Sequence, residues 1–91
     1  MTEKQKIGKF FKDKRETLPS YDYKKENISQ QELADKIGEI SKNTILSIEN
    51  GNGNPTLDNL LILSHALGCK KLNLFDIEID VEKYIKEKNL K

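Results

Sequence analysis

Residues 41–51 gather side chains that can bond to nucleic acid on one side of a predicted helix. This polar side carries an ammonium, an amide and a hydroxyl group, supplied by Lys42, Asn43 and Ser47. Ile45 and Ile48 lie three residues apart, which places them together on a different, apolar face. The polar groups suit base edges and phosphates. An ordinary solvated helix face is the alternative, and we favour the interpretation that this helix reads DNA.

Both ends of this helix carry residues that typically cap helices. Ser41 can accept a hydrogen bond from one of the first backbone amides. Asn50-Gly51 supplies a left-handed stop at the other end. The predicted helix is therefore short, and its limits in the chain are defined.

A second short helix is predicted immediately before it. Ser29 opens this helix, and Glu32 follows three residues later, which predicts a capping box. Ile28 and Leu33 bracket the start as a hydrophobic staple, and Gly38 ends the helix. The residues expected to face inward are Leu33, Ala34 and Ile37. Two short helices joined by a brief turn that contains glycine define a helix-turn-helix unit.

The flanking elements are predicted from hydrophobic periodicity and from helix-breaking residues. Residues 3–17 form a helix closed by a proline, and residues 18–28 form a long loop. Thr56 caps an apolar helix over residues 57–67, which ends at Gly68. This helix is apolar nearly all round, so we expect it to be the central core element.

The C-terminal part of the chain shows two further patterns. A short fifth helix is predicted at Leu72, Leu74 and Phe75. Beyond it, Ile77, Ile79 and Val81 alternate with acidic residues, which predicts a strand, and helical spacing then resumes to residue 88. Because a lone strand is marginal, it should pair with a symmetry mate or pack on the domain. We therefore expect a helix-turn-helix domain, 1–75, and a C-terminal extension, 76–91.

Length and composition restrict the class of protein. A chain of 91 residues is long enough for one domain with a modest core. Its net charge is only +1, but residues 1–25 carry eight basic against four acidic side chains. A single cysteine excludes an intramolecular disulfide and fits a reducing compartment. No membrane-spanning run or signal-peptide pattern is found, so we expect a cytoplasmic location.

The sequence gives no support for an enzyme. His65 is the only histidine and has no second ligand or nucleophile placed near it. Cys69 is interpreted as a core residue rather than a redox sensor. We find no phosphate-cradling glycine loop, metal-ligand cluster or spaced pair of carboxylates, and therefore expect no cofactor, no metal and no small-molecule substrate.

The order of motifs along the chain resembles that of lambda-repressor-like, Cro-type helix-turn-helix domains. The matching residues, within about 7–75, are Ser29-Gln30-Gln31-Glu32-Leu33-Ala34, Gly38, Ser41, Thr44-Ile45, Ile48-Glu49-Asn50-Gly51, Asn54-Pro55-Thr56-Leu57, Leu60-Leu61, Leu63, Ala66-Leu67-Gly68 and Leu74-Phe75. The resemblance implies an all-α, five-helix domain that binds double-stranded DNA as a twofold dimer and regulates transcription. Residues 41–50 would be its recognition helix.

The resemblance also implies roles for individual residues. The expected base contacts are Lys42, Asn43 and Ser47. The expected phosphate contacts are Ser29, Gln30, Asn50, Asn52, Asn54 and Thr56, and the helix starts at Ser29 and Thr56 also offer unpaired amides to phosphate oxygens. Arg15 and Glu49 resemble the pair that ties the first helix to the end of the recognition helix, and Ala34 and Gly38 have structural roles.

Three departures from the family pattern have consequences. Glu39 and Ile40 together fill the gap between Gly38 and Ser41, where relatives usually have one residue fewer, and Ile40 takes the apolar role. The loop 18–28 is longer than usual. The segment after Gly51 carries asparagine where relatives often place a basic residue, which predicts a shallow dependence of DNA affinity on salt.

The leading hypothesis is a transcriptional regulator, a repressor and homodimer, that reads a palindromic operator. Two alternatives stay open. The fold can serve as a protein-interaction module without DNA activity, or as an antitoxin whose tail, residues 76–91, neutralises a partner. In these alternatives the partner surface is the tail or the loop 18–28, where Tyr21, Tyr23, Lys24 and Lys25 can contact a partner or the DNA backbone, or simply pack.

Overall fold

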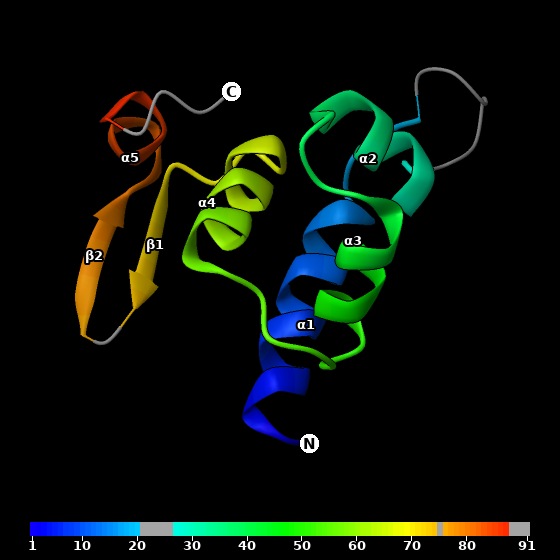
Figure 1. Ribbon diagram of the computed structural model, residues 1–91, viewed down its shortest axis with the longest axis horizontal. Helices are drawn as coiled ribbons and strands as arrows, with labels where there is room; N and C mark the ends of the chain where they lie inside the picture. Colours follow the sequence, from blue (N-terminus) through cyan, green and yellow to red (C-terminus); the bar gives the residue numbers. More distant parts are fainter. Residues whose placement is uncertain (21–26, 75, 88–91) are drawn as a thin grey trace. The chain divides into compact units, whose positions relative to one another are not determined.

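The computed structural model describes residues 1–20, 27–74 and 76–87. Within these residues it contains five helices and one two-stranded antiparallel sheet (Figure 1). In chain order the elements are α1 (Glu3–Arg15), α2 (Gln30–Ile37), α3 (Lys42–Glu49), α4 (Leu57–Ala66), β1 (Lys71–Leu74), β2 (Ile77–Asp80) and α5 (Val81–Glu87). The chain forms two compact units, Met1–Pro55 and Thr56–Lys91. The predicted division at residue 75 stays a prediction.

Each of the first four helices starts at a hydroxyl cap. Ser29, Ser41 and Thr56 each accept a hydrogen bond from the amide three residues later, at 3.0, 3.1 and 3.1 Å. Thr2 caps α1 in the same way and forms a full capping box with Gln5. These caps satisfy amides that have no partner within the helix, so the predicted helix starts are confirmed.

Left-handed glycines follow three of the helices. Gly38 caps α2 at a φ of 78°, and Gly51 and Gly68 follow α3 and α4 at 74° and 80°. This region of backbone space is strained for residues with a Cβ atom, which is why glycine ends these helices.

The capping box predicted for α2 is only half formed. Ser29 accepts from the amide of Glu32, but the Glu32 side chain accepts from the Ser20 hydroxyl at 2.7 Å. Glu32 is 1% exposed, so its carboxylate lies inside the unit rather than at a solvated helix start. The predicted staple residues, Ile28 and Leu33, are both buried. A tertiary contact has therefore replaced the local one.

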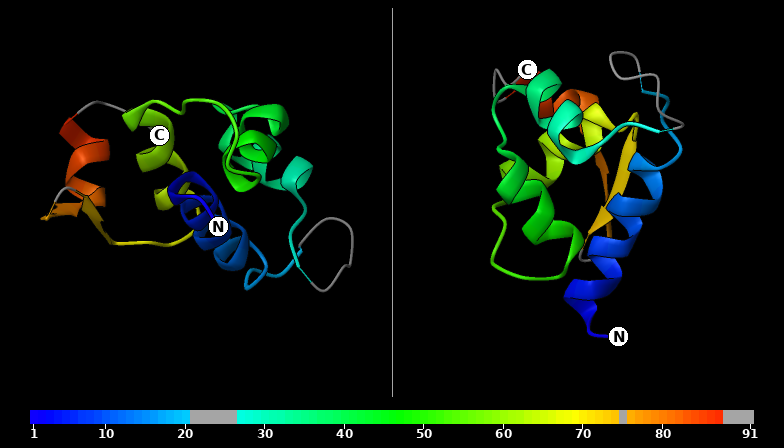
Figure 2. Two further views of the ribbon diagram at one scale, coloured as in Figure 1. Left: turned by 90° about the horizontal axis from the view of Figure 1, so that it is seen from below. Right: turned by 90° about the vertical axis from the view of Figure 1, so that its right-hand side faces the viewer.

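The first unit consists of α1, α2 and α3. Helix α1 packs along α3, and α2 packs on α3 after the turn (Figure 2). Its buried apolar residues are Phe11, Ile28, Leu33, Ala34, Ile40, Ile45 and Ile48. Ile40 is 4% exposed, so it does take the apolar role in the lengthened turn, whereas Ile7 and Phe10 of α1 are at least 40% exposed.

The loop that joins α1 to α2 is closed by a backbone hydrogen bond. The amide of Ile28 donates to the carbonyl of Leu18 at 2.9 Å, so the two ends of the loop meet. The four side chains considered for partner contact, Tyr21, Tyr23, Lys24 and Lys25, lie outside the described residues.

The second unit consists of α4, the β1–β2 hairpin and α5. The fifth helix predicted at residues 72–75 is wrong, because residues 71–74 form β1, and Phe75 lies outside the described residues. The predicted strand is confirmed as β2, and it pairs with β1 in the register Leu72 to Ile79. The helical spacing after it forms α5, which is the fifth helix.

The second unit is buried mainly through aliphatic side chains. Its core residues are Leu61, Ile62, Leu63, Leu67, Val81 and Ile85. Leu57 at the start of α4 is 48% exposed, so this helix is not buried on every side. Cys69 is half-buried rather than enclosed in the core, and His65 is exposed.

Candidate functional site

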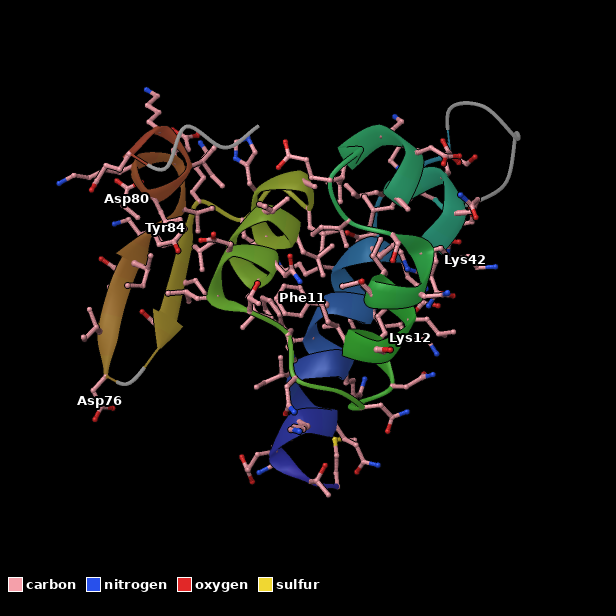
Figure 3. The ribbon with its side chains drawn as sticks, in the orientation of Figure 1. Phe11, Lys12, Lys42, Asp76, Asp80 and Tyr84 are labelled. Atoms are coloured by element: carbon pink, nitrogen blue, oxygen red, sulfur yellow. The ribbon has the colours of Figure 1, made fainter. Side chains whose placement is uncertain are left out.

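The outer face of α3 presents the three residues expected to contact bases. Lys42 and Asn43 occupy the first turn and are exposed, and Lys42 extends away from the ribbon (Figure 3). Ser47 lies one turn further and is half-buried. The Ser41 hydroxyl accepts from the amide of Thr44 at 3.1 Å and fixes where the helix begins. The structure therefore brings the three residues together on one side of one helix.

Leu46 belongs to the same face, although the sequence pattern alone did not identify it as a candidate contact. It is 38% exposed and follows Asn43 by three residues and Lys42 by four. Its neighbour one turn later is Asn50, which is also exposed. An apolar side chain among polar ones can contact the methyl group of thymine. The available signal was its helical spacing from the polar residues.

The C-terminal end of α3 is fixed by a buried ion pair. Arg15 of α1 donates from Nε and Nη2 to the two carboxylate oxygens of Glu49, at 2.8 and 3.0 Å. The Arg15 and Glu49 side chains are only 10% and 2% exposed. Arg15 also donates from Nη1 to the carbonyl of Ile28 at 2.8 Å. One guanidinium thus joins α1, the start of α2 and the end of α3.

Gln30 belongs to this buried network. Its Nε2 donates to Glu49 Oε1 at 2.9 Å, and the side chain lies at the first turn of α2. Glu49 therefore accepts three hydrogen bonds, and these compensate for the burial of its negative charge. The amide of Gln30 is held against the end of α3 rather than against Lys42 or Asn43.

A glycine sets the distance between α1 and α3. A Cβ atom placed on Gly8 would lie 2.3 Å from the carbonyl oxygen of Ile48 and 2.5 Å from that of Glu49. Only a residue without a side chain allows the two helices to approach this closely. Glycine inside a helix costs roughly 1 kcal/mol relative to alanine, so the close approach explains its presence.

The loop after α3 is held against the first turn of α1. The amide of Asn52 donates to the carbonyl of Ser47 at 2.8 Å. Lys4 donates from Nζ to the carbonyl of Gly53 at 2.9 Å and to Asn54 Oδ1 at 2.8 Å. A Cβ atom on Gly51 would lie 2.9 Å from backbone atoms of Gln5. This loop therefore has a defined conformation next to Ser47.

The residues expected to contact phosphates differ in whether their side chains already form hydrogen bonds within the protein. Asn50 and Asn52 are exposed, whereas Asn54 already accepts from Lys4. The Ser29 hydroxyl is used as a helix cap, and so is that of Thr56, which belongs to the second unit. The roles of all these residues at DNA stay predictions.

Acidic side chains lie close to the start of α3. An open hollow of about 740 Å³ beside Lys42 and Asn43 is also lined by Asp35 and Glu39. Both carboxylates are exposed. They lower the positive potential on this side of α3, whereas the opposite end of the helix adjoins Lys4.

Membrane and metal chemistry find no structural support in the part of the chain that is described. No helix there is long and apolar enough to cross a membrane. Among the same residues, no group of three or more His, Cys, Asp or Glu side chains could hold a metal ion.

Comparison with known proteins connects this geometry to a family. A helix-turn-helix family model matches residues 22–74, which include α2, α3, α4 and β1. No curated protein and no solved structure matches the chain. The family match covers more than half of the chain and contains the whole predicted recognition helix. The chain therefore belongs to the lambda-repressor-like, Cro-type helix-turn-helix family of DNA-binding transcriptional regulators.

Proposed function

We propose that this protein represses transcription by placing α3 in the major groove of a specific DNA sequence. The observation that carries the proposal is that α3 has exposed polar side chains in its first turn and a buried ion pair that fixes its C-terminal end. Lys42 and Asn43 are open to solvent, while Glu49 on the same helix is tied to Arg15. A base-reading helix must be held in a fixed orientation, because bidentate contacts to bases require it.

Individual base contacts follow from side-chain chemistry. Asn43 can bond adenine through N6 and N7, and Lys42 can donate to guanine O6 and N7. The Ser47 hydroxyl accepts or donates and is less selective. A good bidentate contact contributes about 1–3 kcal/mol of discrimination against the wrong base. We therefore assign most of the specificity to the first turn of α3.

Phosphate contacts would orient the helix on the duplex. We assign them to Ser29, Gln30, Asn50, Asn52, Asn54 and Thr56, and they would carry no sequence information of their own. Because these side chains are neutral and the net charge is only +1, the electrostatic part of the affinity should be modest.

The size of α3 supports a homodimer. A helix of eight residues reaches few base pairs, so two copies should bind half-sites about one helical turn apart. The operator would then be palindromic. A protein that occupies such a site excludes other proteins from it, which is the basis on which we propose repression.

Selection of binding sites from random duplex DNA tests this function. We expect the wild-type chain to recover a palindromic motif. Asn43→Ala should relax the preference at one position of each half-site, at a cost of about 1–3 kcal/mol. Asn73→Ala is a matched control, because Asn73 is an exposed asparagine on β1. Failure of the wild-type chain to bind any duplex at low salt would contradict the proposal.

The hairpin supports a second candidate function, which is binding to a protein partner. Within the described residues, β2 pairs only with β1, and Ile77 on β2 is 57% exposed. An exposed strand edge beside an apolar side chain can bind another chain. This function would be favoured by a complex with a protein partner that still forms in Asn43→Ala and is lost when residues 76–91 are removed. The protein would then be an interaction module or an antitoxin.

A further inference from the structure

The loop after the recognition helix has no cationic side chain of its own. Its residues, 51–55, are two glycines, two asparagines and a proline. The ammonium group of Lys4 nevertheless lies directly against it, bonded to Gly53 and Asn54. Lys4 is 49 residues away from Gly53 in the chain, so only the fold brings this charge to the loop.

Within the described residues Lys4 forms no ion pair, unlike Lys6 and Lys9 on the same helix. Lys6 forms an ion pair with Glu3 at 2.9 Å, and Lys9 forms one with Asp13 at 2.8 Å. Among the described residues, the partners of Lys4 are a carbonyl oxygen and an amide oxygen, and neither carries a negative charge that would compensate the ammonium group. An ammonium group has three N–H donors, so one donor of Lys4 remains for a further acceptor.

The loop adds backbone donors at the same place. Gly51 and Gly53 have φ values of 74° and 72°, and the amide of Asn52 is bonded to Ser47. In the described part of the chain, the amides of Gly53 and Asn54 donate to no acceptor. A positive charge beside unpaired amides is a suitable environment for a phosphate oxygen.

We propose that Lys4 contacts a DNA phosphate and supplies from α1 the cation that the loop lacks. The inference rests on the DNA binding proposed above and adds a residue outside the helix-turn-helix motif. The loop that Lys4 contacts is held next to Ser47, because the amide of Asn52 donates to the Ser47 carbonyl. The contact would therefore place one phosphate close to the end of the base-reading face.

The salt dependence of duplex binding tests this contact. The probe is a labelled duplex of mixed sequence and about 20 base pairs, because phosphate contacts need no operator. Lys4→Met should reduce the slope of log Kd against log salt by about 1 and weaken binding on the order of tenfold at ~0.05 M salt. Lys6→Met is the control, because it changes the net charge equally from the same helix. It should change the slope by less than half as much.

Two further outcomes separate a phosphate contact from loop positioning. Lys4→Arg should keep the wild-type slope, because the charge is retained. Weaker binding by Lys4→Met with an unchanged slope would mean that Lys4 only holds the loop, and would overturn the proposed contact. Equal slope changes in Lys4→Met and Lys6→Met would overturn it as well. If the wild-type chain binds no duplex, the proposed function fails and this inference fails with it.

Discussion

In the first unit an ion pair is buried between segments far apart in the chain, whereas in the second unit an ion pair lies on the surface. Arg15 and Glu49 meet at 2.8 Å with side chains 10% and 2% exposed. Lys71 and Glu78 meet at 3.5 Å with side chains 65% and 61% exposed. The second unit instead buries aliphatic residues of α4 and α5.

This difference concerns orientation rather than the amount of stabilisation. A guanidinium that bonds both oxygens of a carboxylate fixes direction as well as distance. Burial of aliphatic surface is favourable but has no preferred direction. The directional contact lies at the end of the helix that carries the base-reading residues. We infer that the first unit holds α3 in a defined pose, and that the second unit needs no such device.

Removing the carboxylate charge in each unit gives the largest expected contrast. Glu49→Gln leaves the Arg15 guanidinium buried without a counter-charge, and should lower the free energy of unfolding by about 3–5 kcal/mol. Glu78→Gln removes an exposed partner and should lower it by less than about 1 kcal/mol. Urea denaturation of both variants measures the difference. Similar losses in the free energy of unfolding at the two positions would show that burial does not make the Arg15–Glu49 pair more sensitive to loss of its carboxylate.

A smaller effect is expected where α1 and α3 touch through their backbones. Gly8→Ala replaces a poor helix former by the best one, so helix propensity alone predicts a gain of about 1 kcal/mol. The added Cβ atom would meet the Ile48 carbonyl at 2.3 Å, and a helix shift should cost about 1–3 kcal/mol instead. Thermal unfolding gives the sign of the change.

Lys12→Ala on the same helix is the control for Gly8. Lys12 is exposed, so its replacement should change the free energy of unfolding by less than about 0.5 kcal/mol. If Gly8→Ala stabilises the protein, the close approach of the two helices does not hold in solution.

The helix limits could be predicted from the sequence because capping is local. Ser29, Ser41 and Thr56 each bond an amide three residues away, and Gly38 and Gly51 act on the turn that precedes them. No knowledge of distant residues is needed for such signals. The helix-turn-helix unit is therefore the part of the fold that the sequence predicts best.

Contacts between distant residues were the part that could not be predicted in the same way. Glu32 has the spacing of a capping residue, yet it turns to Ser20 because that hydroxyl is close in the fold. The pattern of Leu72, Leu74 and Phe75 predicts a short helix, although residues 71–74 form a strand because they pair with residues 77–80. Nothing in the sequence near Lys4 indicates that it reaches Gly53. Only the family resemblance predicts the Arg15–Glu49 pair.

A moderate effect is expected for the hydrogen bond between α4 and α5 in the second unit. Among the hydrogen bonds of the described residues, it is the one that joins these two helices. Tyr84 donates from its hydroxyl to Asp58 Oδ1 at 2.5 Å. Tyr84→Phe keeps the ring and removes this donor, and should lower the free energy of unfolding by about 1 kcal/mol. That is well below the loss expected for Glu49→Gln, because Tyr84 and Asp58 are both only half-buried.

The same hydrogen bond makes the contribution of Tyr84 depend on pH. The carboxylate of Asp58 accepts a hydrogen bond from the Tyr84 hydroxyl and so raises the pKa of Tyr84 above its ordinary value of 10.0, and burial and the negative charge act in the same direction. Because the pKa is higher in the folded state, the stabilisation is complete below about pH 10 and is lost as the pH rises through the raised pKa.

The difference in unfolding free energy between wild type and Tyr84→Phe should therefore be constant from about pH 7 to 9 and should shrink above pH 10. Lys9, whose pKa is raised by its hydrogen bond to Asp13, titrates in both proteins and cancels from this difference. A difference that stays constant above pH 10 would show that the hydrogen bond to Asp58 does not raise the pKa of Tyr84.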